Sequence, residues 1–209
     1  DAVTTATATE APSDIASVGT AFVVNAYSSV DWTIAYSISR DTGYPVFAID
    51  HNYISEDFLE TLNTGAFQHV GELILVGGEA VISPEVENAL EDFGDSAGYD
   101  TTRIWGPTGT GTALETIEYV YGPEMVDEVT LVSYEGDLSP NQEEYNEILI
   151  LAAETGSPII PISEDVSGLP ADVTATLNEL GVDSVDVVGS FATEEVKEDL
   201  AEIDVSITQ

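Results

Sequence analysis

The chain has 209 residues and carries 40 Asp and Glu against 3 Lys and Arg, a formal charge of −37 at pH 7. So few cations cannot neutralise a phosphate backbone, which excludes nucleic acids and anionic membrane surfaces as partners. Hydrophobic residues make up 43% of the chain, enough for a packed core, and no apolar run approaches the ~18 residues that span a bilayer.

The charge imbalance predicts a protein adapted to concentrated salt, of the haloarchaeal type. A charge of −37 destabilises a compact state in dilute buffer, whereas molar salt shortens the Debye length to ~3 Å and screens the repulsion. The alternative is an ordinary acidic protein, but such proteins usually keep many lysines, and Lys197 is the single lysine here.

Residues 1–14 are rich in Thr and Ala and predict a mobile arm, or a strand or helix that a neighbouring subunit completes. A first residue other than Met predicts a processed precursor that has lost a signal peptide. The absence of Cys excludes disulfides and thiolate metal sites. The lost signal peptide predicts an extracellular protein.

Short apolar runs then alternate with helical patterns, the signature of a parallel sheet covered by helices. Their Val, Ile and Leu content fits strands that are buried on both faces. The expected strands are 21–26, 45–50, 72–77, 101–105, 129–134, 158–163, 185–189 and 203–207. Ser83-Pro84 and Ser139-Pro140-Asn141-Gln142 predict helix starts, and Gly43 and Gly156 predict helix ends.

The two halves of the chain repeat each other. Asp41-Thr-Gly-Tyr-Pro-Val-Phe-Ala-Ile49 corresponds to Glu154-Thr-Gly-Ser-Pro-Ile-Ile-Pro-Ile162, and Leu73-Ile-Leu-Val-Gly77 corresponds to Val185-Asp-Val-Val-Gly189. Further matches follow in the same order. We therefore predict an α/β protein of two tandem, doubly wound parallel-sheet repeats with helices on both faces, at 15–108 and 109–209.

One stretch carries a family resemblance. Leu73-Ile-Leu-Val-Gly-Gly-Glu-Ala-Val-Ile-Ser-Pro-Glu-Val-Glu-Asn-Ala-Leu90 is followed by Arg103-Ile-Trp-Gly106 and by Thr112-Ala113. This order resembles the type 2 cell-wall-binding repeat family. The family's second Arg falls near Gly109 here, and Gly189-Ser190 replaces the Gly-Gly of the first half.

The resemblance implies doubly wound α/β units, a place at the cell surface, and attachment to anionic wall glycopolymers, often as trimers. A chain of charge −37 would bind such a polymer poorly outside concentrated salt. Ligands of open α/β sheets bind at the carboxyl ends of the strands. The expected contacts with a ligand or partner are Tyr27, Gly77, Gly78, Arg103, Trp105 and Gly106.

Several of these residues also have structural interpretations. Arg103 contacts a ligand, or it forms a charge-assisted bond to a carboxylate or a loop carbonyl. Gly77-Gly78 admits a ligand, or it permits a sharp turn after a strand. The loop 106–112 resembles a phosphate cradle but lacks Lys, so a tight turn is favoured. Trp32 and Tyr36 are one helical turn apart and are expected to pack together.

Enzymatic chemistry finds little support. His51 and His69 could form a triad with Ser28 or Ser29, but no nucleophile-elbow pattern accompanies them. No calcium-loop pattern occurs among the 40 carboxylates, so no metal or cofactor is predicted. The favoured hypothesis is a non-enzymatic structural or adhesive surface protein that self-associates into a filament, layer or other oligomer in high salt. The alternative is a monomeric module that binds a surface glycan.

Overall fold

The structure is a computed structural model, and it describes residues 19–64, 67, 70–122, 126–134, 147–148, 150–151, 154–163, 166–188 and 193–208. The predicted arm 1–14, the helix start at 139–142, His69 and Gly189-Ser190 lie outside these residues.

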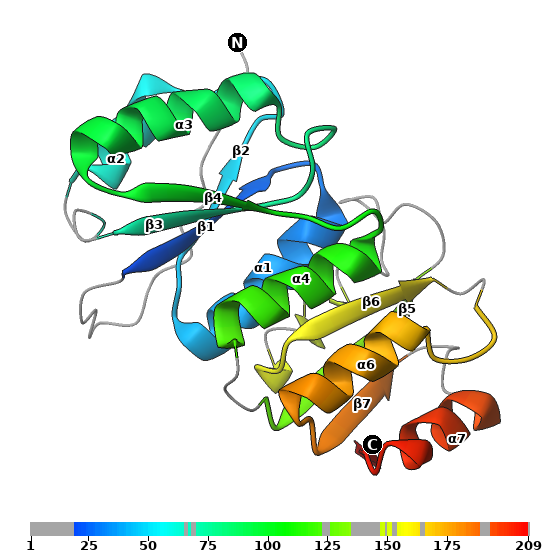
Figure 1. The fold of residues 1–209 in the computed structure, drawn as a ribbon. Helices are drawn as coiled ribbons and strands as arrows, with labels where there is room; N and C mark the ends of the chain where they lie inside the picture. Colours follow the sequence, from blue (N-terminus) through cyan, green and yellow to red (C-terminus); the bar gives the residue numbers. More distant parts are fainter. Residues whose placement is uncertain are drawn as a thin grey trace.

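The first half forms a four-stranded parallel sheet in the order β2-β1-β3-β4 (Figure 1). Strands and helices alternate along the chain, as the apolar runs predict. Their bounds are β1 (Thr20–Asn25), α1 (Ser29–Thr42), β2 (Val46–Ile49), α2 (Glu56–Leu62), β3 (Glu72–Val76), α3 (Pro84–Ala97) and β4 (Asp100–Ile104).

The second half repeats this topology in a sheet of order β6-β5-β7-β8, again parallel throughout. The elements are α4 (Gly109–Tyr121), β5 (Glu128–Tyr134), β6 (Ile159–Ser163), α6 (Ala171–Leu180), β7 (Ser184–Val188), α7 (Glu194–Glu202) and β8 (Ser206–Thr208). The predicted fold class, two tandem parallel-sheet repeats, is confirmed.

The last strand begins later than expected. The sequence predicted a strand at 203–207, but α7 continues to Glu202 and Ile203 caps it, with its backbone N–H bonded to Ala201 and Leu200. Asp204 then adopts a φ of 60°, which turns the chain before the strand can start. The cap of α7 therefore takes up the start of the apolar run that was predicted to be a strand, and β8 has three residues.

The helix boundaries follow local chemistry. Ser83 accepts a hydrogen bond from the Val86 N–H and precedes a proline, as an N-cap should. Gly43 and Gly156 have φ values of 75° and 68°, the left-handed conformation that ends a helix. These positions confirm the predicted helix stops and place the two halves in register.

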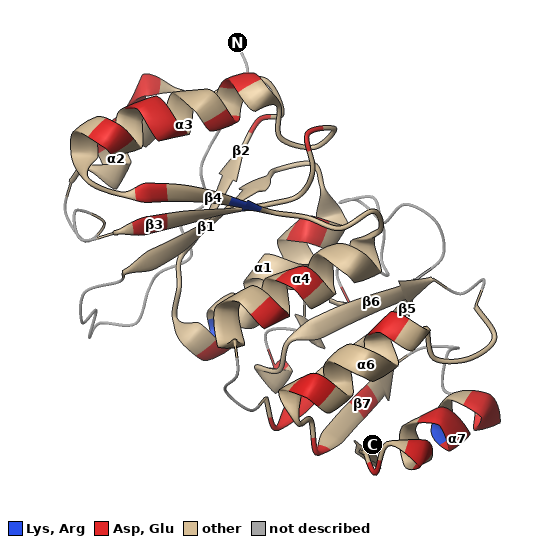
Figure 2. Cartoon of the chain, viewed as in Figure 1, with Lys and Arg blue, Asp and Glu red and all other residues tan. Residues whose placement is uncertain are grey.

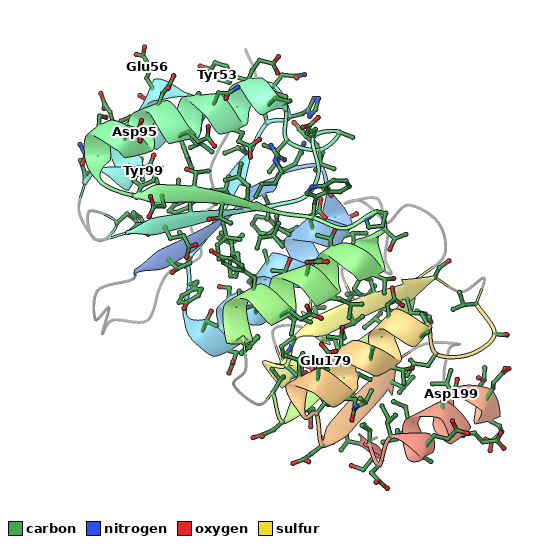
Figure 3. The ribbon with its side chains drawn as sticks, in the orientation of Figure 1. Tyr53, Glu56, Asp95, Tyr99, Glu179 and Asp199 are labelled. Carbon is green, nitrogen blue, oxygen red and sulfur yellow. The ribbon has the colours of Figure 1, made fainter. Side chains whose placement is uncertain are left out.

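The two faces of the first sheet build different parts of the core. Phe22 and Val24 point to the side of α1 and α4, whereas Ala21 and Val23 point to the side of α2 and α3. Figure 1 shows the two helix layers on opposite sides of this sheet. On the α3 side, the Tyr99 ring lies at the helix among the side chains that cover the sheet (Figure 3).

Helices α1 and α4 also face the second half. One hydrophobic cluster contains Ile34 and Ile38 of α1, Ile117 of α4, and Ile160 and Ile162 of β6. The halves thus share a core. The predicted boundary at 108–109 assigns α4 to the second repeat, and that assignment stays a prediction.

Acidic side chains are spread over the helices and strand ends of both halves (Figure 2). In the described ranges, the ion pairs are Arg103–Glu87 and Lys197–Glu194. Most carboxylates in these ranges have no cationic partner, so only ions in the solvent screen the repulsion between them. No helix among the described residues has the length and apolar character to cross a bilayer.

Candidate functional site

A cleft of about 540 Å³ lies beyond the carboxyl ends of β1, β3 and β4. Strand β1 lies between β2 and β3, so the chain crosses to one side of β1 to form β2 and to the other side to form β3. Open α/β sheets bind ligands at such a switch point, beyond the carboxyl ends of the strands. Three segments line the cleft: the start of α1, the loop after β3, and the loop leading into α4. The lining residues are Ser28, Val30, Asp31, Gly78, Glu79, Ala80, Val81, Trp105, Gly106, Pro107, Thr108, Gly109 and Thr112.

Trp105 forms one wall of this cleft. The residue is 54% exposed, although it follows a strand whose last residue, Ile104, is buried. A Cβ on Gly78 would lie 3.4 Å from the indole Cε3, so Gly78 leaves the ring room to lie close to the backbone. The result is an exposed aromatic surface held against a loop.

Gly77 directly follows β3 and lies next to the Asp31 carboxyl. Its φ of 121° lies in the region that favours glycine, and its N–H donates to the Ile104 carbonyl at 2.9 Å. A Cβ at this position would lie 2.8 Å from Asp31 Oδ2. The glycine therefore serves both the turn after β3 and the space that Asp31 occupies.

Asp31 is the buried carboxyl of the cleft, with 5% of the residue exposed. Its Oδ2 accepts a hydrogen bond of 2.6 Å from the Ser28 hydroxyl. Burial raises the pKa of Asp31 to about 6, and the Ser28 hydrogen bond opposes part of that rise. The protonation state of this carboxyl therefore changes in mildly acidic solution.

Arg103 is not a lining residue of the cleft, but its hydrogen bonds connect β4 to the loop after β3 and to α3. The guanidinium donates to Glu87 Oε2 from Nε at 3.0 Å and from Nη2 at 2.9 Å. It also donates to the carbonyls of Gly77 at 2.8 Å and Ile82 at 3.0 Å. The side chain is 9% exposed, so the predicted charge-assisted bond to a carboxylate and loop carbonyls is confirmed.

Two further side chains hold the loop after β3. Asn25, at the end of β1, donates to the Val81 carbonyl at 2.6 Å and accepts from the Tyr27 N–H at 2.7 Å. His51 Nδ1 lies 2.9 Å from the same carbonyl and donates to it. In the described residues, Ser28 bonds to Asp31 and His51 to the Val81 carbonyl. His69 lies outside these residues, so the triad considered from the sequence is not tested.

The glycine-rich loop before α4 is a tight turn. Thr108 caps the helix by accepting from the Gly111 N–H at 3.0 Å, and the Gly106 N–H donates to Thr112 Oγ1 at 3.0 Å. A Cβ on Gly106 would lie 2.4 Å from the Gly111 carbonyl carbon. Gly106 is thus needed for close backbone packing, in line with the favoured interpretation.

The fold is shared with two Clostridium difficile proteins. No protein-family model and no curated protein matches the sequence. Cwp8 from Clostridium difficile has a similar structure, with a TM-score of 0.66 and 22% identity over 91% of this chain and 31% of that chain. Cwp6 from Clostridium difficile gives a TM-score of 0.64 and 17% identity over 88% of this chain and 27% of that chain. The chain spans less than a third of either structure.

The likeness to Cwp8 and Cwp6 agrees with the cell-wall-binding-repeat fold that the motifs suggested. Of the six predicted contact residues, Gly78, Trp105 and Gly106 line the cleft. Gly77 and Arg103 support its walls, and Tyr27 lies outside the lining with 74% of the residue exposed. Their role toward a ligand stays a prediction.

Sequence reasoning missed Asn25 and Asp31. A polar residue that ends a buried strand, as Asn25 does, is a usable signal for a loop-holding side chain. Asp31 gives no such signal, because an acidic residue in the first turn of a helix usually faces solvent. The predicted pairing of Trp32 and Tyr36 is confirmed, since their rings stack with centroids 6.5 Å apart and planes 10° apart.

Proposed function

We propose that this is a non-catalytic protein of the cell surface that binds a surface glycan in the cleft at the carboxyl ends of β1, β3 and β4. The observation that carries the proposal is Trp105, an aromatic residue that is 54% exposed and lines a cleft of about 540 Å³. The fold that the chain shares with Cwp8 and Cwp6, together with the motifs of the cell-wall-binding repeat, supports a surface role.

The cleft suits a sugar in chemistry as well as size. A volume of about 540 Å³ falls within the range of small-ligand sites. The face of an indole carries partial negative charge and packs well against the polarised C–H groups of a sugar ring. Ser28, Glu79 and Thr108 also line the cleft and offer hydroxyl and carboxylate groups to sugar hydroxyls.

The charge of the site favours a neutral glycan over an anionic one. Two acidic residues, Asp31 and Glu79, line the cleft. Arg103, two residues before the cleft-lining Trp105, already donates to Glu87 and to two carbonyls. A polymer bearing carboxylates or phosphates would meet like charge from the site and from the whole chain of −37. Only concentrated salt would relieve that repulsion.

The proposal includes two wider predictions. The excess of carboxylates and the scarcity of lysine support an extracellular protein adapted to concentrated salt. Self-association into a filament, layer or other oligomer in high salt also stays a prediction.

The test is a binding screen at about 3 M KCl, where charge repulsion is largely screened. The wild-type chain is offered an array of neutral and acidic surface glycans, and Trp105→Ala is compared with Tyr119→Ala. Tyr119 is 45% exposed and bonds to Glu72 at the opposite, amino-terminal end of the sheet.

We expect a neutral glycan to bind, and Trp105→Ala to weaken it by about tenfold or more while Tyr119→Ala leaves it within about twofold. Binding that is unchanged in Trp105→Ala would remove the cleft from consideration. Binding confined to acidic glycans would overturn the proposed ligand class. An array without any binder would overturn the glycan function itself.

A further inference from the structure

Ser28 and Asp31 form a hydrogen-bonded pair in the wall of the cleft. Both residues line it, Ser28 as the N-cap of α1 and Asp31 in the first turn of that helix. The Ser28 hydroxyl donates to Asp31 Oδ2 at 2.6 Å, a length typical of a hydrogen bond from a hydroxyl to an ionised carboxylate. The pair therefore has the geometry of its ionised state.

This bond takes Ser28 away from the usual task of an N-cap residue. Ser83, Thr108 and Thr193 each accept a hydrogen bond from a backbone N–H of the helix that they begin. The Ser28 side chain makes no such bond, although it has the same position at α1. Its single hydroxyl hydrogen is bonded to Asp31, so Ser28 offers only lone pairs to a molecule in the cleft.

The surroundings of Asp31 disfavour its charge. The residue is 5% exposed, and its Oδ2 lies where a Cβ on Gly77 would approach it to 2.8 Å. Within the described ranges the ion pairs are those of Arg103 and Lys197, and neither includes Asp31. Burial raises the pKa of Asp31 to about 6, so this carboxyl takes up a proton in mildly acidic solution.

The other charged and titratable side chains around Asp31 come from the neighbouring loops and strands. Glu79, in the loop after β3, lines the same cleft. Arg103 of β4 is paired with Glu87 of α3, and His51, after β2, bonds to a carbonyl of the loop after β3. The loop 105–112 before α4 has no charged side chain. A proton on Asp31 therefore changes the charge of the cleft wall without breaking either ion pair of the described residues.

We propose that Asp31, by taking up or releasing a proton, decides which hydrogen-bonding groups Ser28 presents to a bound sugar. A carboxylate can only accept, so Ser28 must donate to it. A carboxylic acid can donate to Ser28 Oγ, which frees the Ser28 hydrogen for an acceptor on the sugar. One negative charge leaves the cleft wall at the same time. Asp31 is thus a positioning residue, and Ser28 is the residue that contacts the sugar.

This inference rests on the proposed glycan function and adds a pH dependence to it. The ring and glycosidic oxygens of a sugar accept hydrogen bonds and cannot donate them, so they match the protonated pair. Binding of a neutral glycan should be about fivefold or more tighter at about pH 5 than at about pH 7.5. Because this coupling is reciprocal, binding near neutral pH should draw a proton onto Asp31.

The test offers the array of neutral glycans at about pH 5 and about pH 7.5, in about 3 M KCl, to the wild-type chain and three variants. Asp31→Asn can donate to Ser28 at every pH, so it should bind at the higher pH as tightly as the wild type binds at the lower pH. Ser28→Ala should weaken binding at the lower pH and reduce the ratio between the two affinities to less than about twofold. Glu79→Gln removes the other carboxyl of the cleft and is the matched control, which should keep the wild-type ratio.

Two measurements support the binding data. Calorimetry in buffers of different ionisation enthalpy counts the protons taken up on binding, and we expect uptake by the wild type near neutral pH and none by Asp31→Asn. The carboxyl carbon resonance of Asp31 in the free chain examines the pair without any sugar. Its titration midpoint should rise in Ser28→Ala, because the lost hydrogen bond favours the ionised form.

The outcomes separate this inference from the glycan function. Wild-type affinities that agree within about twofold at the two pH values overturn the inference and leave the glycan function standing. A pH ratio that disappears in Glu79→Gln but persists in Asp31→Asn also overturns it, as does an Asp31 midpoint that Ser28→Ala leaves unchanged. An array without any binder at either pH overturns both proposals. If Asp31→Asn does not fold, Ser28→Ala and the proton count of the wild type still decide.

Discussion

Replacing Arg103 with Met tests how the cleft is held together. The guanidinium joins β4 to the loop after β3 and to α3 through four hydrogen bonds of 2.8 to 3.0 Å. Met keeps much of the apolar stem but donates nothing. The variant leaves a carboxylate and two loop carbonyls without their charged donor.

The expected cost follows from burial. Breaking a buried ion pair costs about 3–5 kcal/mol, and a hydrogen bond to a charged group contributes about 1.5–3 kcal/mol. The Arg103 side chain is 9% exposed, but Glu87 is 23% exposed and regains some water when its partner is lost. We therefore expect a loss of about 3 kcal/mol in the free energy of unfolding, near the lower limit for a buried pair.

Lys197→Met is the matched control, because it removes the same charge from the same protein. The Lys197–Glu194 pair is 43% and 86% exposed and should contribute less than about 0.5 kcal/mol. Urea unfolding followed by circular dichroism at about 1 M and 3 M KCl measures both variants. If both lose the same stability within about 0.5 kcal/mol, the Arg103 network does not hold the cleft.

Three further predictions concern single positions. The pKa of Asp31 is raised from 3.8 to about 6, so the folded state binds the extra proton. The wild type should therefore lose about 2.4 kcal/mol relative to Asp31→Asn as pH rises from 4 to 7, and a pH-independent difference would refute this. Gly77→Ala should cost at least about 2 kcal/mol and exceed Gly43→Ala, which has open space around its Cβ, when both are unfolded in urea. Ser37→Ala should cost about 1–3 kcal/mol by leaving a buried N–H unpaired, and thermal unfolding should show less for the exposed Ser96→Ala.

Much of the fold could be predicted from the sequence. Strands buried on both faces read as continuous apolar runs, so seven of the eight predicted strands agree with the structure to within one or two residues. The internal repeat then predicted the same topology twice. The last strand was misplaced because Ile203, which caps α7, belongs to an apolar run that looks the same in a strand.

The site was predictable in place but not in detail. The motif around Gly77 and Arg103 pointed to the loops after β3 and β4, where the cleft lies. Which of these residues face the cleft and which support it depends on side-chain direction. Arg103 turns toward α3 and Trp105 toward solvent, although both belong to the same short segment.

The sequence by itself determined the α/β class, the duplication and the unusual charge, because composition and periodicity are properties of local segments. Only the tertiary structure decided that β6 packs on α1 and α4, and that Ser37, six residues before Gly43, is buried whereas Ile150, six residues before Gly156, is exposed. The repeat makes those two positions equivalent along the chain. Their environments differ because one repeat packs against the other, and packing depends on contacts between segments more than 100 residues apart, as the Ser37–Ile159 bond with its separation of 122 shows.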